Sequence, residues 1–168
     1  HFTLHVPFVD RVRREMERAG GHSWSELQIT KVETDAGITG WGETIQNYTW
    51  GRVKDAERVI GRAPAELMWD DSLGAGLQMA LFDAAGKVAG VPVYRLLGPK
   101  VRDWCAISFW DHDMSPEKYE EEARVCVELG YTCIKIKTRP WFDVRETIER
   151  ISRVTPDHFR IDADWNAF

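Results

Sequence analysis

Two short segments of the chain carry charged side chains where buried strands normally carry apolar ones. In the run Cys-Ile-Lys-Ile-Lys, side chains alternate between faces, so Lys135 and Lys137 share one face. In the same way Arg160, Asp162 and Asp164 share a face of a second run, opposite its apolar residues. Charge on a buried parallel strand is costly unless that face lines a polar cavity. The pattern therefore predicts a polar site along two neighbouring strands.

These charged groups fit an enzyme that removes a proton beside a carboxylate. Two adjacent ammonium groups favour each other's neutral form, so one of the two lysines could act as a general base. Asp162, at the carboxyl end of its strand, could bind a divalent metal ion that neutralises the charge developing on the substrate. The alternative is purely structural, with solvated lysines and an ion pair between Asp162 and Lys137 across neighbouring strands.

The segments that hold these residues alternate between strand and helix. We predict strands over 105–110, 132–138 and 159–165, a helix capped by Ser115 and a helix over 144–154. Strands that alternate with helices at this spacing form a parallel sheet with right-handed crossovers. A barrel with its active site at the carboxyl-terminal mouth explains why both charged faces point the same way.

The first hundred residues show a different pattern. Alternation over 25–34 and 38–43, around the turn at Asp35-Ala36-Gly37, predicts a hairpin. Apolar and small residues at three- and four-residue spacing predict a helix over 72–90. Weaker patterns predict a strand within 1–10 and helices over 52–61 and 93–97.

The composition is that of an ordinary soluble globular protein. The 168 residues are 43% apolar and 29% charged, and the net charge of −5 is spread over interspersed acids and bases, which predicts no nucleic-acid partner. No run of about 18 apolar residues occurs, so we predict no membrane span. Cys105, Cys126 and Cys133 have no metal-like spacing and fit a reducing cytoplasm, and we place Cys133 in the core.

Sequence motifs that cover nearly the whole chain occur in a consistent order. They are Gly40-Trp41-Gly42-Glu43, the helix and turn over 77–98, Lys135-Ile136-Lys137 and Asp162-Ala163-Asp164. Together they resemble the enolase superfamily, in the branch of mandelate racemase and muconate lactonizing enzyme. The resemblance implies an α+β capping domain over 1–100, followed over 101–168 by the first three strands of a truncated (β/α) barrel of the TIM type.

The resemblance also implies Mg²⁺-dependent abstraction of the proton α to a carboxylate. Lys137 would be the base, Lys135 its electrostatic companion and Asp162 a ligand of Mg²⁺. Asp164 stands where asparagine is commoner, and its role stays open between the outer shell of the metal and the substrate. Further candidates for substrate contact are Arg139, directly after the Lys-x-Lys strand, and Arg11, Arg14 and His22 in the cap loop of about residues 7–24.

The specific reaction depends on residues that a complete barrel of about 250 residues would add. We expect an acid-sugar dehydratase, because the cap loop is basic and Arg139 follows the lysines. The alternatives are a racemase or epimerase, a cycloisomerase, or, in another class, a truncated association module without catalysis. We expect the chain alone to be inactive, its remaining metal ligands and second acid or base to lie beyond Phe168, and the complete protein to be a cytoplasmic homo-oligomer acting on a small carboxylate.

Overall fold

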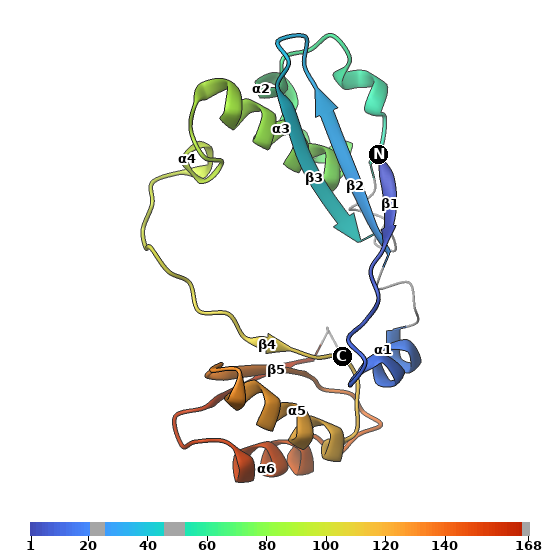
Figure 1. The fold of residues 1–168 in the computed structure, drawn as a ribbon, viewed down its shortest axis with the longest axis vertical. Coiled ribbons are helices and arrows are strands. Elements are labelled where there is room, and N and C mark those ends of the chain that lie inside the picture. The colour runs from blue at the N-terminus through green and yellow to red at the C-terminus, as the bar shows by residue number, and fades with distance from the viewer. Residues whose placement is uncertain (21–25, 46–52, 166–168) are drawn as a thin grey trace. The chain divides into compact units, whose positions relative to one another are not determined.

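The computed structural model describes residues 1–20, 26–45 and 53–165, which form two compact units (Figure 1). The first unit comprises His1–Pro7 and His22–Asp103. The second comprises Phe8–Gly21 and Trp104–Phe168. The second unit therefore combines an early segment with the last part of the chain. The expected domains over 1–100 and 101–168 stay a prediction.

The first unit contains an antiparallel sheet in the order β1-β2-β3. Its strands are β1 (Phe2–His5), β2 (Glu26–Glu33) and β3 (Thr39–Ile45). Leu27 pairs with Ile45 and Glu33 with Thr39, so the predicted hairpin is confirmed.

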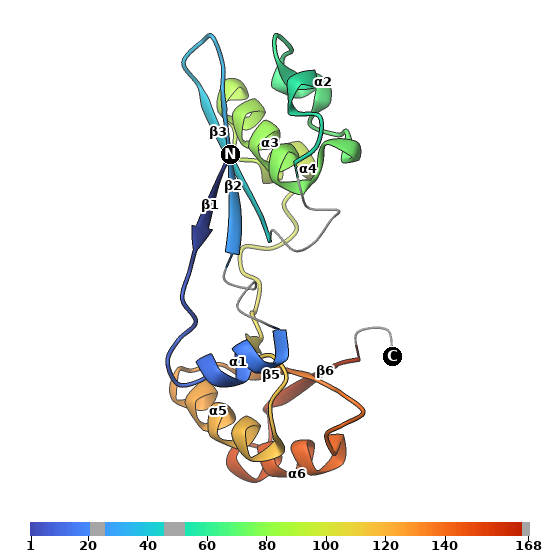
Figure 2. The ribbon, with the colours of Figure 1, turned by 90° about the vertical axis from the view of Figure 1, so that its right-hand side faces the viewer.

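Helix α3 (Ala75–Ala89) packs against β2 and β3, as both ribbon views show (Figures 1 and 2). Leu77 and Leu81 of this helix are almost fully buried and cluster with the buried Leu73. Gly40 and Gly42 allow the close approach, because a Cβ at either position would overlap the helix backbone. The predicted helix is confirmed, and its close packing gives the Gly-x-Gly motif a structural role.

The remaining elements of the first unit are short. The helix predicted over 52–61 is wrong for the described part of that segment, which holds only the 3₁₀ turn η2 (Ala56–Val59). Asp55 has a left-handed backbone with φ 44° and Ile60 is extended, so a regular helix stops at both ends. The other elements are α2 (Pro64–Leu67), η3 (Asp71–Leu73) and α4 (Tyr94–Leu97).

The second unit contains a parallel sheet in the order β4-β5-β6. The strands are β4 (Phe109–Trp110), β5 (Cys133–Lys137) and β6 (Arg160–Asp164), and the helices between them are α5 (Pro116–Glu128) and α6 (Val144–Val154). Both helices cover the face that carries Ile134 and Ile136, which are buried (Figure 1). Strand, helix, strand, helix, strand is the predicted arrangement.

Strand β4 is much shorter than the predicted strand over 105–110. Phe109 pairs with Ile134, so in the same register residues 105–107 would face residues 130–132. That part of the chain is the turn after α5, where Gly130 has φ 83°, and a turn offers no ladder to pair with.

Helix α1 (Arg13–Gly20) was not predicted, because its segment is mostly charged. Val12 and Met16, four residues apart, are buried against Met114 and Tyr119 in the core of the second unit. Two apolar residues give too weak a period for a sequence pattern to reveal a helix.

Candidate active site

The two lysines of β5 lie on the face opposite the covering helices. Ile134 and Ile136 are buried beneath α5 and α6, and side chains alternate along the strand, so Lys135 and Lys137 occupy the other face. The parallel register places Lys135 beside Asp162 and Lys137 beside Asp164 on β6. The structure thus brings these predicted residues together on one face of one sheet.

Asp164 joins the two lysines. Its Oδ2 lies 2.7 Å from the Nζ of Lys135 and 2.7 Å from the Nζ of Lys137. Lys137 is largely buried, with 9% of its side chain exposed. A carboxylate between two ammonium groups offsets their mutual repulsion. The alternative interpretation predicted an ion pair between Lys137 and Asp162 across neighbouring strands. Lys137 does form an ion pair across these strands, but its partner is Asp164.

Asp162 is held by Cys133 on the adjacent strand β5 and by Ser108, which directly precedes β4. Its Oδ2 accepts a hydrogen bond of 2.6 Å from the Oγ of Ser108 and lies 3.2 Å from the Sγ of Cys133. The Ser108 hydrogen bond holds the pKa of the Asp162 carboxyl below its usual value. The carboxylate is therefore ionised near neutral pH, as a ligand of a hard cation must be.

The placement of Cys133 in the core was wrong. The residue lies only half-buried, on the same strand face as the lysines, and its thiol contacts Ser108 and Asp162. Burial raises the pKa of the thiol, so it is not a reactive thiolate. Ser108 had been given no role, because a single serine before a short strand carries no sequence signal.

Arg139 lies beside a carboxylate of the loop that follows β4. Its Nε donates a 2.8 Å hydrogen bond to Asp113, and its guanidinium lies over the Trp141 ring at 5.7 Å from the centroid. The Nδ1 of His112 is 3.8 Å from Asp113, and burial lowers the pKa of that imidazole. Arg139 is thus oriented within the protein at the end of the lysine strand, while its contact with a substrate stays a prediction.

The cap-loop residues have different surroundings. Arg11 donates from Nε to both carboxylate oxygens of Glu122 at 3.1 and 2.9 Å, so this edge of its guanidinium is engaged within the protein. Arg14 is exposed on α1. His22 lies outside the described residues. Their roles in substrate contact stay predictions.

A buried carboxyl pair is formed between the loop that follows β4 and the middle of α5. Asp111 and Glu122 are 4% and 1% exposed, and no partner is found for the Oδ2 of Asp111. Burial first, and the neighbouring Glu122 second, raise the pKa of Asp111 to about 7. The Arg11 guanidinium offsets part of this effect. The pair is suited to holding a proton near neutral pH.

We expect Asp111→Asn to stabilise the protein above neutral pH. The folded state holds the Asp111 proton more tightly than the unfolded state, so ionisation makes the wild type lose stability as pH rises toward about 7. The asparagine amide does not ionise, so the variant avoids this loss of stability, which is at most about 4 kcal/mol. Urea unfolding of both proteins should show a gain at about pH 8 that shrinks toward about pH 4. A gain in the free energy of unfolding that did not depend on pH would contradict the raised pKa of Asp111. So would an equal gain from Asp157→Asn, at an exposed position.

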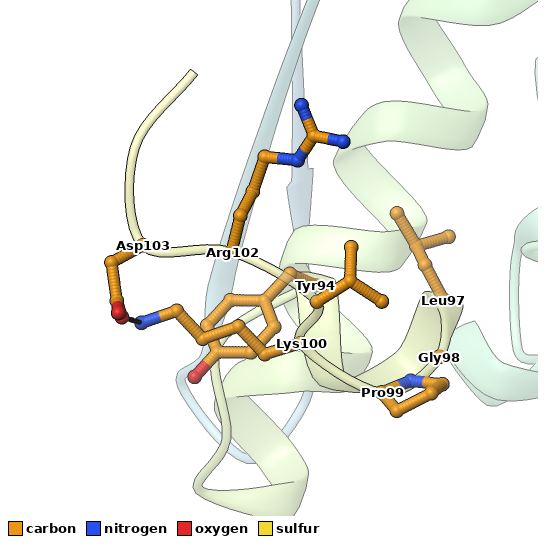
Figure 3. Close-up of a pocket in the computed structure, with 8 residues that line it drawn as sticks. Tyr94, Leu97, Gly98, Pro99, Lys100, Arg102 and Asp103 are labelled. Atoms are coloured by element: carbon orange, nitrogen blue, oxygen red, sulfur yellow. Dashed lines mark ion pairs between the residues drawn. The ribbon is translucent and has the colours of Figure 1, made fainter.

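A separate hollow of about 520 Å³ lies in the first unit, around the end of α4 (Figure 3). The Nζ of Lys100 lies 6.0 Å from the Tyr94 ring centroid and pairs with Asp103. The hollow is open and contains none of the predicted site residues. Its remaining lining residues are Leu97, Gly98, Pro99, Val101 and Arg102.

Known proteins match both the sequence and the fold. A D-galactonate dehydratase from Xanthomonas oryzae pv. oryzae is 40% identical over 138 residues, which are 68% of this chain and 35% of that protein. A muconate cycloisomerase variant has a TM-score of 0.64 at 26% identity, over 84% of this chain and 47% of that one. A magnesium-complexed enolase-superfamily member from Roseovarius nubinhibens has a TM-score of 0.65 at 23% identity, over 84% and 45%. No family model matches.

The chain has the enolase-superfamily fold. The resemblance stated from the motifs is confirmed, as is the fold of a capping domain followed by part of a barrel. The chain spans about a third of the curated relative and about half of the solved chains. None of the helices in the described ranges is long and apolar enough to cross a membrane.

The described residues do not form a metal site by themselves. Within those residues no group of three or more His, Cys, Asp or Glu side chains could hold a metal ion. Asp162 could supply one ligand from the described residues, but Mg²⁺ binds through more oxygens than one carboxylate supplies.

Proposed function

We propose that this chain forms the cap and the base-bearing strands of an acid-sugar dehydratase. The observation that carries the proposal is the juxtaposition of Lys135 and Lys137 with Asp162 on one face of two parallel strands. The identity to a D-galactonate dehydratase supports an aldonate substrate, a sugar acid with a hydroxyl on the carbon next to C2.

In the proposed reaction Lys137 takes the C2 proton of the substrate. This requires a neutral amine, so its proton must leave and its contact with Asp164 must open before it acts. Lys135 remains cationic and faces the developing negative charge of the carboxylate. The C3–O bond then breaks, and an acid from the rest of the protein gives the leaving hydroxyl the proton that makes it water. The enol that remains becomes a 2-keto-3-deoxy acid.

We propose Mg²⁺ as the cofactor, in line with the magnesium complex of the Roseovarius protein. A bound Mg²⁺ would stabilise the negative charge that develops on the substrate carboxylate. Asp162 fits one ligand position, because it is ionised and held by Ser108. The other protein ligands would come from the rest of the protein. The homo-oligomeric state and the cytoplasmic location also stay predictions.

The test is proton exchange by the complete protein in D₂O with Mg²⁺ and a panel of aldonates that includes D-galactonate. We expect deuterium at C2, or loss of the C2 proton signal together with a keto acid product, measured by ¹H NMR. The Asp162→Asn variant should bind Mg²⁺ more weakly by calorimetry and lose most of this activity.

The products of this assay separate the alternatives. Exchange with inversion at C2 and no loss of water would favour a racemase or epimerase, and a ring-closed product a cycloisomerase. If no acid in the panel exchanged a proton in the presence of Mg²⁺, the enzymatic proposal would fail and the association module would be favoured.

A further inference from the structure

The backbone ladder between β4 and β5 stops just before Lys137. Trp110 pairs with Lys135, so in the same register His112 would pair with Lys137. The hydrogen bond from the Asp111 N–H to the Lys135 carbonyl is already long, at 3.5 Å. The two strands are therefore separating at the position of the proposed base.

The hydroxyl of Tyr119, from α5, accepts the hydrogen bond that the Lys137 N–H would donate if the ladder continued. It donates a 2.6 Å hydrogen bond to the His112 carbonyl and accepts a 2.9 Å hydrogen bond from the Lys137 N–H. One hydroxyl thus bridges the two strands where a direct bond between backbone groups would have drawn them together.

The Tyr119 side chain is fixed in one position. It is 1% exposed and packs in the core with Ile134 and Ile136, whose side chains point away from the lysine face. Burial raises the pKa of the phenol above its ordinary value, so the hydroxyl keeps the proton that it donates to His112. The phenol ring therefore sets the spacing of the strands by its length.

The peptide of Lys137 is also held from the other side. The N–H of the next residue, Thr138, donates a 3.0 Å hydrogen bond to the Asp164 carbonyl on β6. With the Tyr119 bridge, the backbone beneath the lysine is tied to both neighbouring strands. We propose that Tyr119 is a positioning residue that places the Lys137 amine for proton abstraction, an inference that rests on the proposed function.

The experiment compares Tyr119→Phe with the wild type in the complete protein. The variant keeps the ring and removes the bridge, so the strands either close directly or leave two buried backbone groups without a partner. We expect kcat for C2 proton exchange to fall by about tenfold or more, with a KM within about twofold, because binding groups are untouched. Exchange of the Lys137 backbone amide with solvent, followed by NMR, should become faster.

Thr147→Val is the matched control. Thr147 is 3% exposed, and its hydroxyl donates a 2.9 Å hydrogen bond to the Asp143 carbonyl at the start of α6. Thr147→Val removes a buried hydroxyl from the same unit, away from the β4–β5 junction. We expect a comparable loss of stability, with kcat and the Lys137 amide unchanged.

The outcomes separate the two proposals. If Tyr119→Phe kept the kcat of the Thr147→Val control, the positioning role would be overturned even with an active wild type. An unchanged Lys137 amide would overturn the bridge itself, whatever the activity. A wild type without any proton exchange would remove the proposed function, and the positioning role with it.

Discussion

Lys137→Ala should abolish C2 proton exchange in the complete protein. The rate should fall by about 10³-fold, within the range expected for loss of a positioned general base. Removing the side chain leaves Asp164 paired with Lys135, so the fold of the sheet should persist. The measurement is the loss of the C2 proton signal in D₂O, with Mg²⁺ affinity followed in parallel by calorimetry.

Two comparisons make this result specific. Mg²⁺ affinity should stay close to the wild-type value, because the proposed ligand Asp162 does not rely on Lys137. Lys118→Ala removes a half-buried lysine of α5 that pairs with the exposed Glu121, and it should leave exchange unaffected. Exchange by Lys137→Ala at the rate of the Lys118→Ala control would exclude Lys137 as the base.

The polar face of the barrel segment was predictable because a strand has a strict two-residue period. Once β5 was recognised, alternation alone placed Lys135 and Lys137 opposite the isoleucines. Neither the bridging contact of Asp164 nor the hydrogen bond of Ser108 could be predicted, since both depend on side-chain rotamers and strand register. Sequence patterns thus locate a charged face, while the pairing within it requires the fold.

Helical segments were less predictable where their buried stripe was narrow. The amphipathic α6 was expected. In the described part of 12–20, by contrast, the buried side chains are Val12, just before α1, and Met16. Tyr119 gave no signal either, because an aromatic residue one turn into a helix normally marks the core. Its second role, at the hydroxyl, arises only from the separation of β4 and β5.

The Gly-Trp-Gly-Glu motif, in contrast, supported the resemblance without a physical reason for its glycines. Gly42→Ala should therefore strongly destabilise the first unit. A Cβ at Gly42 would overlap the carbonyl oxygen of Gly76 and would also meet the backbone nitrogen of Ala80 at 2.7 Å. Relief requires α3 to move off the sheet, away from the contacts that bury Leu77 and Leu81. We expect a loss of about 3 kcal/mol or more in the free energy of unfolding.

Gly37→Ala is the matched control, because it adds the same methyl group without a steric clash. No atom lies within 4 Å of a Cβ at Gly37, but its φ of 77° is unfavourable for alanine, which costs about 1 kcal/mol. Urea unfolding of both variants should therefore give a loss at Gly42 clearly larger than the loss at Gly37. Equal losses would mean that backbone conformation alone explains the motif. A larger loss at Gly42 would assign the motif to the contact between α3 and the sheet, independently of any chemistry at the barrel mouth.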